Sequence, residues 1–203
     1  DYGIAEIDAE AGFAENSNIA EVEITAGDDV ELVADYESDS EVVAWASDGE
    51  NNTANVAITA GDKVIVEASS EYSEAEIQAT AAYNQEQNNA NIAISAGGDI
   101  RVMSEDYESS AKIEAESIYG VENNAVVDLL ANNVYVMARD GGESQISALA
   151  ENGKPFMGPI FLQEPLPEQP EEPIETSNSA TVNIETFAVE VEASDGVDPR
   201  RQS

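Results

Sequence analysis

NVAITAGDKVIVEA, residues 55–68, holds two short runs of alternating apolar residues on either side of a Gly-Asp turn. Close copies are VEITAGDDVEL from Val22 and IAISAGGDIRV from Ile92, and weaker copies are VDLLANNVYV from Val127 and VNIETFAVEV from Val182. The residues that anchor the first run of each copy are Ile24, Ile58, Ile94, Leu129 and Ile184, at steps of 34, 36, 35 and 55. A period near 35 residues is typical of repeat proteins, in which each repeat buries its apolar face against the next.

Each repeat also contains a third alternating stretch, which follows a loop rich in Ser, Asp and Glu. Its anchors are Ile7, Val42, Ile77, Ile113 and Ile146, at steps of 35, 35, 36 and 33. Period-two alternation over such lengths is typical of strands with one buried face. We therefore predict an all-β fold, a parallel β-solenoid (triangular β-helix) of about five coils with three strands per coil. The alternative is a β-sandwich, in which the Gly-Asp turn would close a hairpin.

The corners of the predicted coil repeat as regularly as its strands. Asparagines precede the first strand at Asn16 and Asn18, Asn51 and Asn52, Asn88 and Asn89, and Asn123 and Asn124. Stacked asparagines form amide ladders. Rings at Phe13, Tyr83 and Tyr119 follow the third-strand anchor by six residues, and we expect them to stack inside a corner. We expect Gly27, Gly61 and Gly97 to serve a corner that needs a positive φ.

A proline-rich segment interrupts the pattern at residues 152–178, which hold six of the seven prolines. Such a density disfavours central strands and favours an extended excursion. We interpret the segment as an insertion, with its apolar half packed along the solenoid and its acidic half exposed. A motif for a proline-binding partner is the alternative. Residues 1–195 then form one solenoid domain, and residues 196–203 a tail or linker.

The charge of the chain restricts its partners. Forty-three Asp and Glu face seven Lys and Arg, for a net charge of -36. Nucleic-acid binding needs clustered basic residues, so we expect no nucleic acid among the partners. The chain has no Cys and no His, which excludes zinc sites built on these residues. It also has no apolar run of the length that a membrane-spanning helix requires, so no transmembrane segment is predicted.

The repeats NVAITAGDKVIVEA and NIAISAGGDIRVMS resemble the β-helical repeats of filamentous-haemagglutinin-like bacterial adhesins and other giant surface proteins. The resemblance covers residues of about 1–150 and 179–194. It implies a secreted protein at the cell surface, with a solenoid that acts as a long shaft in adhesion or fibre formation. Surface glycans are among the partners that it suggests.

Aspartates at the Gly-Asp turn are candidate metal ligands. Asp28, Asp62 and Asp99 occupy the turn in three successive repeats, and we expect them to stack into a column of like charges. A bridging cation would stabilise such a column, and oxygen ligands suit Ca²⁺. In the alternative interpretation, each aspartate only satisfies backbone groups of its own turn.

Catalysis is not expected. Among 43 acidic residues, pairs of carboxylates at glycosidase spacing arise by chance. The basic residues Lys63, Arg101, Lys112 and Arg139 are scattered rather than gathered at one break in the repeat. A carbohydrate-binding or polysaccharide-cleaving β-helix protein is the alternative function.

The two ends of the repeat array are in phase. The chain begins with a third strand, represented by Ile4, Ile7 and Ala9, and it ends with a first and a second strand, represented by Ile184, Val189 and Val191. Joined end to end, the strand order continues without a break. The leading hypothesis is a structural or adhesive extracellular solenoid, a fibre-forming subunit or a shaft segment that assembles head to tail with itself or with neighbouring solenoid repeats. Because the sequence starts at Asp1 without a methionine, we expect a processed product or an excised piece.

Overall fold

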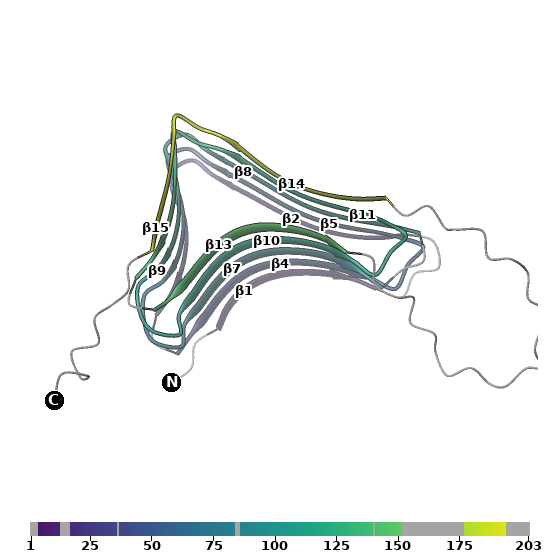
Figure 1. Ribbon diagram of the computed structural model, residues 1–203, viewed down its shortest axis with the longest axis horizontal. Coiled ribbons are helices and arrows are strands. Elements are labelled where there is room, and N and C mark those ends of the chain that lie inside the picture. Colours follow the sequence, from purple (N-terminus) through teal and green to yellow (C-terminus); the bar gives the residue numbers. More distant parts are fainter. Residues whose placement is uncertain are drawn as a thin grey trace, which may run out of the picture.

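The computed structural model describes residues 4–12, 17–35, 37–83, 86–139, 141–151 and 177–193. Within these ranges fifteen strands form three five-stranded sheets, and neighbouring strands in every sheet are parallel (Figure 1). The strands make four complete coils, with one strand before the first coil and two after the fourth. The predicted parallel β-solenoid with three strands per coil is confirmed. The sandwich alternative is wrong, because the Gly-Asp turn joins strands of two different sheets instead of closing a hairpin.

The three sheets are the sides of the triangle in Figure 1. Sheet A consists of β1 (Ile4–Ala11), β4 (Asp39–Ser47), β7 (Glu74–Ala82), β10 (Ser110–Ile118) and β13 (Glu143–Glu151). Sheet B consists of β2 (Ser17–Ala26), β5 (Asn51–Ala60), β8 (Gln87–Ala96), β11 (Glu122–Leu130) and β14 (Ser177–Glu185). Sheet C consists of β3 (Val30–Ala34), β6 (Val64–Ala68), β9 (Asp99–Ser104), β12 (Asn133–Ala138) and β15 (Ala188–Ala193). Sheet A bows toward the interior, so its outer face is concave.

Register places equivalent residues of successive coils beside one another. One interior column of sheet B is Ile24, Ile58, Ile94, Leu129 and Ile184. One interior column of sheet A is Ile7, Val42, Ile77, Ile113 and Ile146. In the middle coils these side chains are fully buried, together with small alanines from all three sheets. Each buried valine or isoleucine contributes roughly 1.5–3 kcal/mol, so a thin aliphatic core holds the coils together.

A column of buried asparagines lines the corner between sheets A and B. Side-chain amides donate from each coil to the next, from Asn18 to Asn52 (3.3 Å), Asn52 to Asn88 (3.2 Å), Asn88 to Asn123 (3.2 Å) and Asn123 to Asn178 (3.1 Å). Four of the amides also donate to the backbone carbonyl of a residue at the end of a sheet A strand, namely Ser47, Ala82, Ile118 or Glu151. The predicted amide ladder is confirmed for these inner asparagines. Asn51, Asn89 and Asn124, predicted beside them, lie at outward positions.

Close approach of the backbone explains the glycines of the corner between sheets B and C. A Cβ atom on Gly61 would lie 2.1 Å from the carbonyl oxygen of Gly27, and one on Gly97 would lie 2.2 Å from that of Gly61. None of the three has a positive φ, so that expectation was wrong. The left-handed conformation occurs instead at other corners, for example in Asp48, Tyr83 and Tyr119.

Two of the predicted aromatic residues stack. The rings of Tyr83 and Tyr119 lie 5.1 Å apart between centroids, with 12° between their planes. Their exposed fractions are 53% and 43%, so the pair lies on the outside of the corner and the expected interior position was wrong. The left-handed backbone at both residues turns the side chains outward. Phe13 lies outside the described residues.

Strand β14 resumes the coil after the proline-rich segment. Its Ile184 is in register with Leu129 of β11, which accounts for the 55-residue step in the repeat. Nearly all of the predicted insertion, residues 152–176, lies outside the described residues, as does the tail at 196–203. No helix suited to crossing a membrane occurs in the part of the chain that the structure describes.

Replacing one ladder asparagine should destabilise the fold strongly. Asn88→Ala removes the hydrogen bonds that Asn88 donates to the Ile118 carbonyl and to Oδ1 of Asn123 and the one that it accepts from the Asn52 amide, and should lower the free energy of unfolding by about 2–4 kcal/mol. The matched control is Asn89→Ala at the neighbouring outward position, expected within about 0.5 kcal/mol of wild type. Urea unfolding followed by circular dichroism measures both. Equal effects would show that the amide ladder contributes nothing beyond an ordinary surface residue.

The glycine corner gives a second matched pair. Gly61→Ala forces a side chain against the Gly27 carbonyl and should cost about 1–3 kcal/mol. Gly27→Ala places its methyl group in open space, since no atom lies within 4 Å, and should leave the stability of the isolated chain near that of wild type. Thermal unfolding of dilute samples compares the two variants. A Gly27→Ala variant as unstable as Gly61→Ala would contradict the close-approach explanation.

Candidate functional site

The first end of the solenoid is the outer edge of β1, β2 and β3. Each of these strands pairs on one side only within the described residues, so it presents a row of backbone donors and acceptors. Ile7 would be buried in a middle coil, but here its exposed fraction is 51%. Ala9 lies at the next interior position of β1 and is half-buried. Ile4 is exposed too, but it lies at an outward position, because its partner in β4 is Asp39.

The second end is the outer edge of β13, β14 and β15. Interior positions are again left uncovered, with exposed fractions of 51% at Val189 and 73% at Val191. Ile184 is half-buried between β11 and the open side. The structure therefore places the six predicted assembly residues on terminal strands, five of them at interior positions and Ile4 on the outside.

The two ends carry the same residue types at equivalent interior positions. Following the register through all five strands of each sheet aligns Ile146 with Ile7, Asn178 with Asn18, Ala180 with Ala20, Val182 with Val22, Ile184 with Ile24, Val189 with Val30 and Val191 with Leu32. A second copy placed end to end would thus continue these seven interior columns with a residue of similar size. Sequence reasoning found the phase of the strands, but only the register shows this residue-by-residue match.

The concave outer face of sheet A gathers carboxylates that sequence reasoning did not single out. Glu6, Glu41 and Glu76 form one outward column, and the signal for it is a glutamate every 35 residues. Burial, followed by the charge of Glu74, raises the pKa of Glu76 from 4.5 to about 7. Burial also raises the pKa of Glu41, with help from neighbouring carboxylates. Lys112 is a nearby cation, and its Nζ lies 3.7 Å from Glu74.

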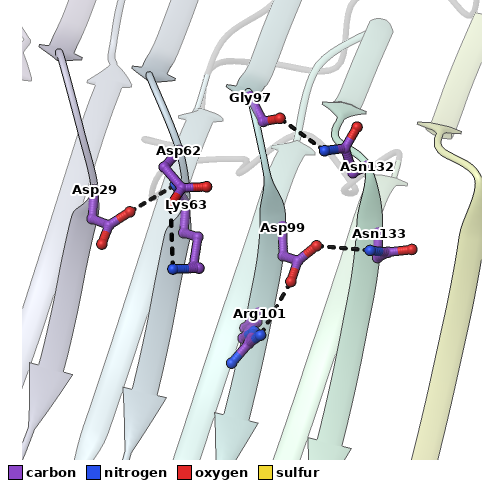
Figure 2. Close-up of polar contacts among 8 residues, drawn as sticks. All are labelled: Asp29, Asp62, Lys63, Gly97, Asp99, Arg101, Asn132 and Asn133. Atoms are coloured by element: carbon purple, nitrogen blue, oxygen red, sulfur yellow. Dashed lines mark hydrogen bonds and ion pairs between the residues drawn. The ribbon is translucent and has the colours of Figure 1, made fainter.

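The predicted aspartate column at the corner between sheets B and C needs a correction. Backbone pairing aligns Asp28 with Asp62 and Asp62 with Gly98, because the Asp62 amide donates to the Asp28 carbonyl and the Gly98 amide to the Asp62 carbonyl. Asp99 lies one position further along, where it accepts hydrogen bonds from Asn133 (2.8 Å) and Arg101 (3.1 Å), as Figure 2 shows. The hydrogen bond from Asn133 and then that from Arg101 lower the pKa of Asp99.

Asp29 takes the place of Asp99 in the acidic cluster. Oxygens of Asp28, Asp29 and Asp62 lie within 4.8 Å of one another. The chain itself supplies a cation here, because Nζ of Lys63 lies 3.3 Å from Asp62 and its backbone amide donates to Asp29 (Figure 2). The calcium hypothesis remains a prediction for Asp28 and Asp62 and no longer includes Asp99.

A shallow hollow of about 440 Å³ on the outer face of sheet B also escaped sequence reasoning. It exists because Ala57 and Ala93 occupy an outward column in which other coils carry Glu23, Asp128 and Asn183. Small residues at outward positions are the signal that would have revealed it.

Comparison of the chain with protein-family models, with curated protein sequences and with solved structures finds no significant match. The resemblance to filamentous-haemagglutinin-like adhesins therefore stays a prediction.

The raised pKa of Glu76 predicts a pH-dependent stability. Because the folded-state pKa lies above the unfolded value, the destabilisation is absent below about pH 4.5, grows up to pH 7 and is complete above it. Glu76→Gln should therefore raise the stability at pH 8, by about 1–2 kcal/mol after allowance for solvent screening, and leave it unchanged at pH 4.

Thermal unfolding between pH 4 and 8 measures this effect. The control Glu31→Gln removes one carboxylate from the exposed face of sheet C and should change the stability little at either pH. A Glu76→Gln variant that is no more stable than wild type at pH 8 would show that the concave face does not destabilise the charged form.

Proposed function

We propose that this chain is a structural protein, a solenoid subunit or shaft segment that assembles head to tail. The observation that carries the proposal is the residue-by-residue match between the interior positions of its two ends. A junction between two copies would cover Ile7 of one copy and Val189 and Val191 of the other. It would also pair the open edges of all three sheets. Covering apolar side chains and satisfying backbone groups both favour association.

An assembly of this kind is open-ended. The two contacting surfaces differ, so the contact is heterologous, and repetition along the solenoid axis yields a filament instead of a closed ring. Fifteen strands in three sheets correspond to an axial rise of about 24 Å per subunit, at roughly 4.8 Å per coil. A net charge of -36 opposes association at long range, and salt screens that repulsion.

The proposed location is extracellular or at the cell surface, and the proposed roles are fibre formation and adhesion. The resemblance of NVAITAGDKVIVEA and NIAISAGGDIRVMS to adhesin repeats supports both. In a longer shaft, the neighbour at each end would be another solenoid repeat. The same interior columns would then continue within one chain.

Carbohydrate binding or cleavage is the second candidate function. It is favoured by the concave outer face of sheet A, where Glu76, with its pKa near 7, lies among other carboxylates. A general acid and a carboxylate base are what glycoside cleavage requires. Stacking of one glutamate per coil accounts for the same feature without a substrate, so the structural function is preferred.

Filament formation by the purified chain is the direct test. We expect sedimentation to show mass increasing with concentration in 0.15 M NaCl, and negative-stain electron microscopy to show filaments with an axial repeat of about 24 Å. The same samples with millimolar calcium test whether the cation contributes. Monodisperse short rods at every concentration and salt would contradict the proposal.

Deleting one coil separates a structural role from a catalytic one. Removing residues 53–88 joins Asn52 directly to Asn89. Since Asn52 pairs with Asn88 and Thr53 with Asn89 in the intact sheet, the deletion removes one whole coil and keeps the register. The shortened chain should still assemble, with an axial repeat reduced by about 4.8 Å. Loss of assembly with a folded product would contradict the shaft model.

A further inference from the structure

We propose that the junction between subunits is directional, with an acidic end of one copy seated on an end of the next copy that carries amides and hydroxyls. At this junction the side-chain amides of Gln145 and Asn183 in one copy pair with the carboxylates of Glu6 and Glu23 in the next copy. The partner is a second copy of this chain, and this inference rests on the proposed function.

The acidic end is formed by the outward positions of β1, β2 and β3. Their carboxylates are Glu6, Asp8, Glu10, Glu21, Glu23 and Glu31. No basic residue lies on these three strands. Two such ends brought together would oppose carboxylate to carboxylate, which is unfavourable for directly stacked strands.

The opposite end is neutral at most of the matching positions. Continuing the register across the junction pairs Glu6 with Gln145, Asp8 with Ser147, Glu10 with Leu149, Glu21 with Thr181, Glu23 with Asn183 and Glu31 with Glu190. Five of the six carboxylates therefore meet a neutral side chain. The exception, Glu31 with Glu190, lies on sheet C, the sheet with the shortest strands.

Amide–carboxylate stacking already bonds coils within the subunit. Gln87 donates to Glu122 (2.6 Å), Asn133 to Asp99 (2.8 Å) and Asn183 to Asp128 (2.7 Å), each across one coil. A side-chain amide carries two N–H donors, so Asn183 can bond to Asp128 on one side and to Glu23 of the next copy on the other. The rule that operates between coils thus extends to the junction.

The asparagine ladder adds a direction. Every amide in it donates toward the later coil, from Asn18 through to Asn178. Seating Asn18 of the next copy on Asn178 continues the ladder with the same polarity. A junction between two like ends would oppose two donors or two acceptors at this buried column and would break the parallel pairing of the sheets. Head-to-tail stacking is therefore the orientation that these contacts select.

An added charge tests the pair formed by Gln145 and Glu6. Gln145→Glu places a carboxylate beside Lys112 within the subunit, which favours the fold, but opposite Glu6 at the junction. It should raise the critical concentration for assembly about fivefold, the effect of one like-charge pair. The double variant Gln145→Glu with Glu6→Lys should restore assembly, since the junction then pairs opposite charges. Sedimentation at low salt measures all variants, and thermal unfolding confirms that each is folded.

Disulfide cross-linking tests the register, and the absence of native cysteine leaves no background. Stacked Thr181 and Glu21 would bring their Cα atoms to about 4.8 Å, within the range that a disulfide spans. Mixing the single variants T181C and E21C under oxidation should give a heterodimer. T181C mixed with E23C is the control displaced by two residues, for which we expect little product.

The outcomes separate this inference from the proposed function. Heterodimers of T181C with E21C, together with rescue of Gln145→Glu by Glu6→Lys, support the directional junction. Disulfide homodimers of T181C or of E21C alone, or unchanged assembly of Gln145→Glu, overturn the directional junction. In that case filament formation by the wild type still supports the proposed structural function. A wild-type chain that never assembles overturns both.

Discussion

Parallel pairing between strands one coil apart places every side chain about 4.8 Å from its equivalent in the next coil, and the other features of this protein depend on that constraint. Apolar residues stack into continuous columns, so a thin core of Val, Ile and Ala is fully buried in the middle coils although no single coil could bury it alone. Asparagines stack into a ladder for the same reason. The corner glycines Gly61 and Gly97 are explained by it too, because each is stacked on the turn of the preceding coil, which leaves no space for a Cβ atom.

The same constraint governs charge. A protein with a net charge of -36 cannot avoid stacked carboxylates, and where sheet A is concave the outward column at Glu41 and Glu76 becomes partly desolvated, with raised pKa values. Elsewhere the chain alternates carboxylates with amides or basic residues. Asp99 is paired with Arg101 of its own coil and with Asn133 of the next, and Asp62 lies beside Lys63 of its own coil (Figure 2).

At both ends of the described solenoid the terminal strands pair with a neighbouring strand on one side only. Interior residues such as Ile7 and Val191 are exposed there, and the outer edges of the terminal strands carry backbone groups that a further coil would pair. In the proposed filament, neighbouring subunits make the same kinds of contact that neighbouring coils make within one subunit. Interior columns continue with matched sizes, and outward carboxylates meet neutral groups.

The sequence by itself determined the repeat, and therefore the sheets. Regular spacing of Ile24, Ile58 and Ile94 and of the third-strand anchors predicts which residues share a column, since a period of one coil maps directly onto strand pairing. It also identified the inner asparagines and the phase of the two ends. Only the tertiary structure decided the details of the corners. Asp99 lies in the column of Lys63 and Asp29 and not in that of Asp62, and Tyr83 and Tyr119 stack on the outside. The positions of these corner residues depend on turn conformation, which the period of the strands does not specify. The concave carboxylate face depends on the curvature of sheet A, which cannot be read from the pattern of residues along one strand.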